Sequence, residues 1–102
     1  MNPGHTLVIP KAHYRNIFDI PEETFLDVAR TLKKVALAVK AGSGADGINV
    51  SSSHEPSAGQ EVFHLHFHLI PRFAGDGLKH WPQSSYAEGE AQKVAEKIKA
   101  AL

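Results

Sequence analysis

Residues 59–72 read GQEVFHLHFHLIPR, and three histidines alternate there with leucine and phenylalanine. A β-strand sends alternate side chains to opposite faces, so this alternation predicts a strand with His64, His66 and His68 on one face. The apolar side chains between them fall on the other face, which we expect to be buried. One face of the strand is therefore structural, and the histidine face is the candidate for chemistry.

A second strand and a loop of small residues precede the histidine strand. Residues 48–53 (INVSSS) follow an Asp-Gly turn and alternate apolar with polar side chains, as a half-buried strand does. The loop at residues 54–59 is short, so the two strands are predicted to pair in antiparallel fashion. This pairing brings Ser53 beside the start of the histidine row, which Pro71 is expected to end.

A third strand and two helices complete the predicted elements. Residues 5–9 (HTLVI) indicate a strand, and residues 21–41 repeat apolar side chains at three- and four-residue steps, as an amphipathic helix does. A similar pattern over residues 85–102 indicates a C-terminal helix. The order strand, helix, strand, strand, helix predicts one α+β domain over residues 1–102. Its sheet is expected to be mostly antiparallel, with the central helix and the C-terminal helix packed on it.

Composition argues against several classes of protein. The 102 residues include eleven basic and eleven acidic side chains, so the overall charge does not favour a nucleic acid as partner. The absence of cysteine removes thiol nucleophiles, disulfides and cysteine-based zinc sites, and it fits a reducing compartment. No secretory signal and no run of roughly 20 apolar residues is present. We therefore predict a cytoplasmic protein that does not enter a membrane.

Imidazoles at alternate positions of a strand suit phosphate chemistry. They lie roughly 7 Å apart, so two rings can contact one phosphate group. Rings this close discourage one another from becoming charged, which keeps one neutral and nucleophilic. We predict that His66 attacks phosphorus while His64 and His68 orient it or donate to phosphate oxygens. Backbone N–H groups near Gln60 to Val62 are expected to stabilise the transition-state charge.

A metal site is the competing interpretation of these histidines. His-x-His pairs are common zinc ligands, yet three histidines along one straight strand span roughly 13 Å, too far for all three to reach one ion unaided. We therefore predict no metal and no cofactor. On the residues alone, His5 is open between a surface residue and a fourth member of the site. His13, His54 and His80 are expected in loops or at the surface.

These segments resemble the histidine triad (HIT) family, whose His-x-His-x-His signature with following apolar residues is matched by HLHFHLI at residues 64–70. Residues 3–13 (PGHTLVIPKAH) resemble the family's earlier strand, and residues 58–62 (AGQEV) resemble its phosphate-side loop. The resemblance covers residues 3–72 and, more loosely, the C-terminal helix. It begins at the family's second third, so the usual leading helix, first hairpin, nucleobase pocket and ribose-binding acidic residue are expected to be absent.

The resemblance implies a nucleotide-binding hydrolase or transferase that acts on the α-phosphate of nucleotidyl conjugates through a nucleotidyl-histidine intermediate. It implies His66 as the nucleophile, His64 as its support and His68 at the phosphate or leaving group. It also brings His5 into the site, for proton relay or orientation. A homodimer is implied as well.

Three phosphate-binding positions follow from the same resemblance: Gln60, Val62 and Ser53. Ser53 stands where relatives usually carry Asn or Gln, and Glu61 stands where phosphoramidase-type members often carry Ser. Both purine nucleoside phosphoramidates and dinucleoside polyphosphates are therefore candidate substrates. Zinc is not expected, because the bacterial branch binds it with two cysteines that this sequence lacks.

Two other interpretations stay open. The chain could be a catalytically weak nucleotide- or metal-binding module that retains the triad but lacks the nucleoside pocket. It could also be a shortened form of a longer, ordinary family member, in which case its function is that of the family. An intact triad favours the enzyme, and the missing nucleoside elements favour the binding module.

Overall fold

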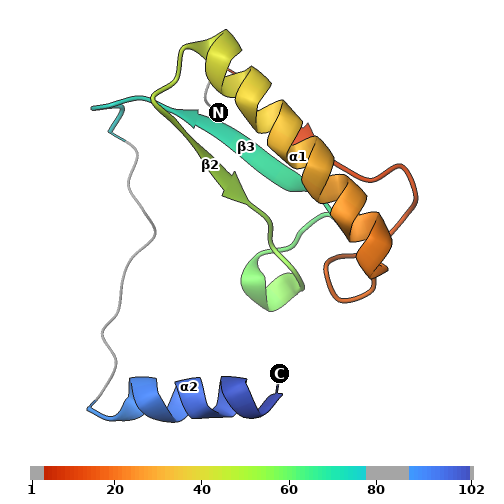
Figure 1. The fold of residues 1–102 in the computed structure, drawn as a ribbon, viewed down its shortest axis with the longest axis vertical. Helices are drawn as coiled ribbons and strands as arrows, with labels where there is room; N and C mark the ends of the chain where they lie inside the picture. Colours follow the sequence, from red (N-terminus) through yellow and green to blue (C-terminus); the bar gives the residue numbers. More distant parts are fainter. Residues whose placement is uncertain (1–3, 78–87, 102) are drawn as a thin grey trace.

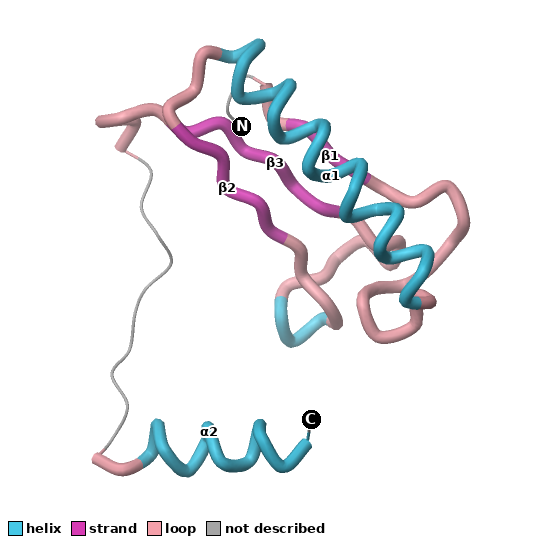
Figure 2. Tube along the Cα trace, viewed as in Figure 1, coloured by secondary structure: helices cyan, strands magenta, loops and turns pink. Residues whose placement is uncertain are grey.

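A three-stranded sheet and two helices make up the fold in the computed structural model, which describes residues 4–77 and 88–101 (Figure 1, Figure 2). The elements follow in the order β1 (Thr6–Val8), α1 (Glu22–Ser43), β2 (Gly47–Ser51), the 3-10 helix η1 (Pro56–Ala58), β3 (Phe67–Arg72) and α2 (Glu90–Ala101). The sheet is antiparallel in the order β1-β3-β2, so β3 is its central strand. The predicted α+β class and the predicted pairing of the two strands around the small-residue loop are confirmed.

Helix α1 lies across one face of the sheet (Figure 1). An acidic first turn complements the positive end of its dipole. Gly44 ends the helix with φ of 70°, a left-handed conformation that glycine adopts without steric penalty. These local signals agree with the predicted range of residues 21–41, which the helix exceeds by two residues at its C-terminal end.

The core forms between this helix and the sheet. Val28 of α1 packs with Val8 of β1 and Leu69 of β3, and all three are buried. Burial of each such side chain contributes about 1.5–3 kcal/mol. Partly buried neighbours complete the cluster: Ile20, Leu32, Val35, Ala36, Ile48 and Phe67.

The two faces of β3 have different surroundings. Leu69 is 0% exposed, and Phe67 on the same face contacts Phe25 of α1 with ring centroids 6.3 Å apart. His68 points to the opposite face and is paired in register with Leu7 of β1. Helix α1 therefore covers the apolar face and leaves the histidine face open, as the alternation predicts.

β3 is shorter than the predicted strand. It begins at Phe67, and residues 61–66 precede it as irregular chain. The Leu65 N–H donates to the carbonyl of Tyr14 at 2.7 Å, so a loop rather than a strand pairs with the chain at that point. His64 and His66 consequently lie outside the sheet, and the prediction that one continuous strand carries all three histidines is wrong.

At its other end, β3 continues through Pro71, which was expected to end the row. β1 pairs no further along β3 than Leu69, so a proline two residues later removes no hydrogen bond to β1. Arg72, the last residue of β3, donates to both carboxylate oxygens of Asp76 at 2.8 and 3.0 Å and also to the side-chain oxygen of Asn49. These contacts fix the exit of the strand.

The C-terminal helix is present as predicted, but it does not pack on the sheet. α2 makes no contact with α1 or the strands, and Val94 is its one half-buried side chain among residues 90–101. Ser85, His80 and Trp81 lie outside the described residues. Neither α1 nor α2 combines the length and apolar character that crossing a bilayer requires.

Candidate active site

The triad histidines line one open pocket on the face of the sheet away from α1. The pocket has a volume of about 390 Å³ and is bordered by Leu7, Ile9, Val62, His64, His66 and His68. The rings of His66 and His68 lie edge to face, with centroids 5.0 Å apart. The three histidines therefore share one surface although only His68 lies within β3.

The ring of His66 is oriented by the backbone. Its Nδ1 lies 2.8 Å from the carbonyl oxygen of His64, and a carbonyl only accepts, so Nδ1 carries the proton. The neutral ring then keeps its lone pair on Nε2. The carbonyl of His66 accepts a hydrogen bond from Ser52 Oγ at 2.7 Å. Both the tautomer and the backbone of His66 are therefore held in place, and Nε2 is the ring nitrogen that carries the lone pair.

The ring of His64 is held by the chain that follows β1. Its Nε2–H donates to the carbonyl of Pro10 at 2.9 Å. His13 packs edge-on against the same ring, with centroids 5.1 Å apart. His13 is an exposed loop residue, as expected, and its contact with the triad is made through His64. Within residues 4–77 and 88–101, no group of three His, Cys, Asp or Glu side chains is arranged to hold a metal ion.

His5 joins the triad through His68. His5 Nε2 and His68 Nδ1 are 2.9 Å apart, so one ring donates and the other accepts. Burial, and then the nearby rings of His66 and His5, lower the pKa of His68 below that of an ordinary histidine. The residues alone left His5 open between a surface residue and a fourth member of the site, and this geometry favours the second interpretation.

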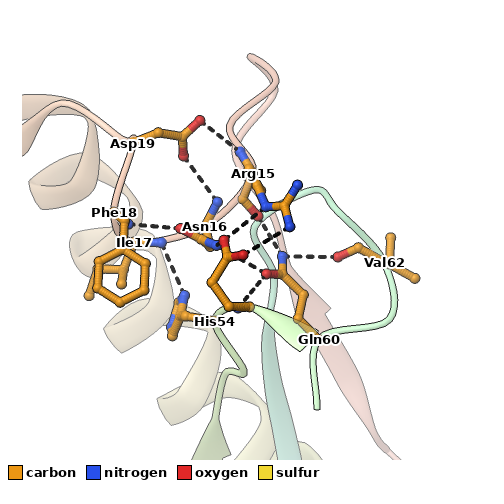
Figure 3. Close-up of polar contacts among 9 residues, drawn as sticks. Arg15, Asn16, Ile17, Phe18, Asp19, His54, Gln60 and Val62 are labelled. Carbon is orange, nitrogen blue, oxygen red and sulfur yellow. Dashed lines mark hydrogen bonds and ion pairs between the residues drawn. The ribbon is translucent and has the colours of Figure 1, made fainter. Parts of the chain in front are cut away.

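Gln60 is buried and fully engaged within the protein (Figure 3). Its Nε2 donates to the carbonyls of Arg15 at 2.6 Å and Val62 at 3.1 Å. Its Oε1 accepts from the Glu55 N–H at 2.7 Å and from Asn16 Nδ2 at 3.1 Å. The backbone N–H of Gln60 donates to the Glu55 carbonyl. Gln60 therefore shapes the loop, and in this structure it presents no unengaged donor of the kind predicted for a direct phosphate contact.

The other two predicted phosphate positions lie on different sides of the loop. Val62 is largely exposed and borders the pocket. Ser53 is half-buried and lies beside Gly59, where its Oγ is 3.7 Å from the position that a Cβ on that glycine would occupy. Ser53 is not among the residues that border the histidine pocket.

Polar contacts join the loop before α1 to the loop around η1 (Figure 3). Arg15 donates from Nε and Nη2 to the two carboxylate oxygens of Glu55 at 2.8 and 2.9 Å. Asn16 is 1% exposed and bridges the Glu55 carboxylate and Gln60. The Asp19 carboxylate accepts the backbone N–H groups of Asn16 and Arg15, and these bonds lower its pKa. No sequence pattern predicts this network, because the two loops that it joins are about forty positions apart and form no periodic pattern.

His54 belongs to the same junction. Its Nδ1 accepts a hydrogen bond from the Ile17 N–H at 3.0 Å, and its ring lies edge-on to Phe18 and Phe67. Burial, and then the proximity of His66, lower the pKa of His54. His54 thus lies in a loop, as expected, and it is half-buried there as a structural contact near the site.

The sequence profile of the HIT domain matches residues 1–75. This chain belongs to the HIT family. It is 42% identical over 76 residues to an uncharacterized HIT-like protein of Saccharolobus solfataricus, a match covering 74% of this chain and 55% of the relative. It is 44% identical over 69 residues to adenosine 5′-monophosphoramidase of Saccharomyces cerevisiae, covering 68% and 41% respectively. The HIT chain spans about half the length of the curated relatives it matches.

A solved HIT family structure has the same fold. The member from Bacillus subtilis superposes with a TM-score of 0.83 at 32% identity, covering 97% of this chain and 73% of that one. The antiparallel sheet and helices described above are therefore a HIT fold. Among the HIT relatives, one from Arabidopsis thaliana is named an adenylylsulfatase, and the one from Saccharomyces cerevisiae is named an adenosine 5′-monophosphoramidase.

Proposed function

We propose that this HIT chain cleaves nucleotidyl conjugates by attack of His66 on the α-phosphorus. The observation that carries the proposal is the bond from His66 Nδ1–H to the His64 carbonyl, which leaves the lone pair of the neutral ring on Nε2. A second supporting observation is the position of His68 beside His66, with His5 bonded behind it. The proposed nucleophile and His68, one member of a proton-carrying pair, then border one pocket.

The proposed reaction has two steps. The Nε2 lone pair of His66 forms a bond to phosphorus, and the bond from phosphorus to the leaving group breaks. The leaving group keeps the electron pair of that bond and takes the one extra proton that the His5–His68 pair carries at the start of the cycle. Water then attacks phosphorus, the N–P bond breaks, and a nucleoside monophosphate leaves. The water proton returns to the histidine pair, which restores His66 for the next cycle. Val62 and the backbone near it are proposed to border the phosphate.

Purine nucleoside phosphoramidates are the proposed substrates, with dinucleoside polyphosphates as the second class. The similarity to an adenosine 5′-monophosphoramidase supports the first class. The apolar rim of the pocket, formed by Leu7, Ile9 and Val62, supports a substrate with an apolar surface next to the phosphate.

A homodimer is part of the proposal. β1 and β2 are the edges of the sheet over residues 4–77, and Leu7 and Val50 on them are about half exposed. Unpaired strand edges with exposed apolar side chains favour association. Sedimentation of the purified chain tests the dimer, and a purely monomeric profile would contradict it. A cytoplasmic location stays a prediction.

The test of the reaction is release of AMP from an adenosine phosphoramidate, with and without a chelator. Wild-type protein is expected to release AMP in both conditions and to carry an acid-labile adenylyl group on His66. His66→Ala is expected to lose at least a hundredfold in kcat and to keep its circular dichroism spectrum. His54→Asn is the control, because Asn retains an acceptor for the Ile17 N–H. Substrate binding without turnover by the wild type would favour the binding module instead, and loss of AMP release with chelator would contradict the metal-free mechanism.

A further inference from the structure

Glu55 has a backbone conformation that side chains rarely adopt. It is the one non-glycine residue with a positive φ among residues 4–77 and 88–101, with φ of 80° and ψ of 154°. The extended ψ suits a residue before proline, but the positive φ brings its Cβ close to the backbone. Strain of this kind persists only where surrounding contacts hold the residue in place.

Glu55 is held in place through both its side chain and its backbone. Its carboxylate accepts the two-pronged bond from Arg15 and a further bond from Asn16. Its N–H donates to the Gln60 side chain, and its carbonyl accepts from the N–H groups of Ala58 and Gln60. The charged fork is the strongest of these interactions, since bidentate pairs of Arg and carboxylate combine charge with geometric fit.

Arg15 also contacts the far end of the loop. The guanidinium carbon lies 4.4 Å from the ring centroid of Phe63, a cation–π contact. Phe63 was predicted to be buried on the apolar face of the histidine strand, yet it is 42% exposed, because the strand does not begin until four residues later. Arg15 therefore touches the loop of residues 55–63 at its first and last residues.

The same loop leads to the pocket. Gln60, which receives the Glu55 N–H, donates to the carbonyl of Val62 at 3.1 Å. Val62 borders the pocket, and His64 follows two residues later. Neither Arg15 nor Glu55 is among the residues that border the pocket, so any effect they have on chemistry acts through the loop.

We propose that Arg15 and Glu55 are positioning residues: their ion pair holds the loop of residues 55–63 in the conformation that sets Val62 and His64 at the pocket. The inference rests on the proposed function for its kinetic consequences. Catalysis is sensitive to small displacements of the groups around a reacting atom, and misplacement by about 1 Å can reduce a rate about a hundredfold. The ion pair is exposed at the surface, so its contribution to global stability is small and its main effect is local.

Glu55→Gly separates positioning from stability. Glycine adopts the positive φ without strain, and this gain offsets the greater entropy of glycine in the unfolded chain and the loss of the carboxylate that Arg15 and Asn16 hold, so the melting temperature is expected to change little. kcat for the adenosine phosphoramidate is expected to fall about tenfold with KM changed less than about twofold. Arg15→Lys keeps the charge but loses the planar fork and the stacking on Phe63, and it is expected to act in the same direction. Arg30→Lys is the matched control, since Arg30 pairs with Asp27 on exposed α1 surface.

The results of these experiments distinguish a failure of the positioning role from a failure of the proposed function. Wild-type kcat in both Glu55→Gly and Arg15→Lys would overturn it, as would a fall in activity that merely follows a fall in melting temperature. If the wild type itself forms no adenylyl-histidine, the proposed function fails and imidazole NMR spectra decide the positioning role. Shifted His64 and His66 ring signals in Glu55→Gly, with unchanged signals in Arg30→Lys, would support it. Unchanged His64 and His66 signals in Glu55→Gly would overturn it.

Discussion

The triad is held in two different ways on either side of Phe67. His68 lies within β3, where pairing with β1 and β2 fixes its backbone. His64 and His66 precede the strand, and their rings are fixed by single hydrogen bonds to the carbonyls of Pro10 and His64. The strand side is thus stabilised by the sheet and the core, whereas the loop side depends on a few polar contacts from segments distant in sequence.

The sheet therefore does not carry the proposed nucleophile directly. His66 is positioned by Ser52, by its bond to His64 and by the loop that Gln60 organises. Loop positions of this kind allow small adjustments around a substrate, and they are also the easiest to disturb. Substitutions on the strand side should therefore change mainly stability, whereas substitutions on the loop side should also change catalysis.

The largest expected effect comes from two buried leucines, one on each side of Phe67. Leu69 is 0% exposed and belongs to the core cluster, whereas Leu65 is 1% exposed and lies between His64 and His66. Leu69→Ala is expected to lower the free energy of unfolding by about 2–5 kcal/mol, measured by urea denaturation. Among molecules that remain folded, its kcat should stay near wild type. Leu65→Ala should lower kcat severalfold in the folded protein. A severalfold loss of kcat in Leu69→Ala, with kcat near wild type in Leu65→Ala, would contradict the difference between the strand side and the loop side.

A smaller effect is expected from Gln60→Glu, which keeps the size of the side chain and removes its two donors. The carbonyls of Arg15 and Val62 would then face a carboxylate in a buried position. The expected loss in free energy of unfolding is about 1–3 kcal/mol, because buried acceptors are left without partners. Gln92→Glu on the exposed surface of α2 is the control and should change stability little. Equal stability of the two variants would show that the Gln60 contacts do not hold the loop.

The smallest effect concerns pH. Burial lowers the pKa of His68 and of His54 in the folded protein, while the unfolded chain titrates near 6.5. The unfolded state therefore binds more protons below that pH. The stabilisation that comes from these two histidines is complete above about pH 6.5, and it is lost as pH falls through the folded pKa values. Urea denaturation from pH 8 to pH 5 should show a shallow decline, reduced in His54→Asn. A stability that rises on acidification over this interval would contradict the direction of both shifts.

The elements with a periodic pattern could be predicted from the sequence. The three- and four-residue steps placed α1 almost to its observed bounds, and Gly44 accounts for its end. Alternation predicted which face of β3 is buried and which is open, because the consecutive residues Leu69 and His68 lie on opposite faces. Alternation also predicted that His64, His66 and His68 lie together, and all three border one pocket, although His64 and His66 precede the strand.

What could not be predicted depends on contacts between loops. Alternation over residues 61–66 is compatible with a strand, but the Leu65 N–H is satisfied by Tyr14 and no neighbouring strand is required. The role of Gln60 depends on Arg15, Asn16 and Glu55, whose positions relative to it have no local signature. The packing of α2 was wrongly expected, because an amphipathic pattern indicates an apolar face and not the surface that covers it.

The hydrogen bond between His5 and His68 limits how many protons that pair can hold. With two neutral rings, or with one extra proton, a single N–H lies between His5 Nε2 and His68 Nδ1 and the contact is intact. A second extra proton would place two N–H groups against each other, so the rings would separate. The pair thus holds at most one extra proton while the two rings stay in contact.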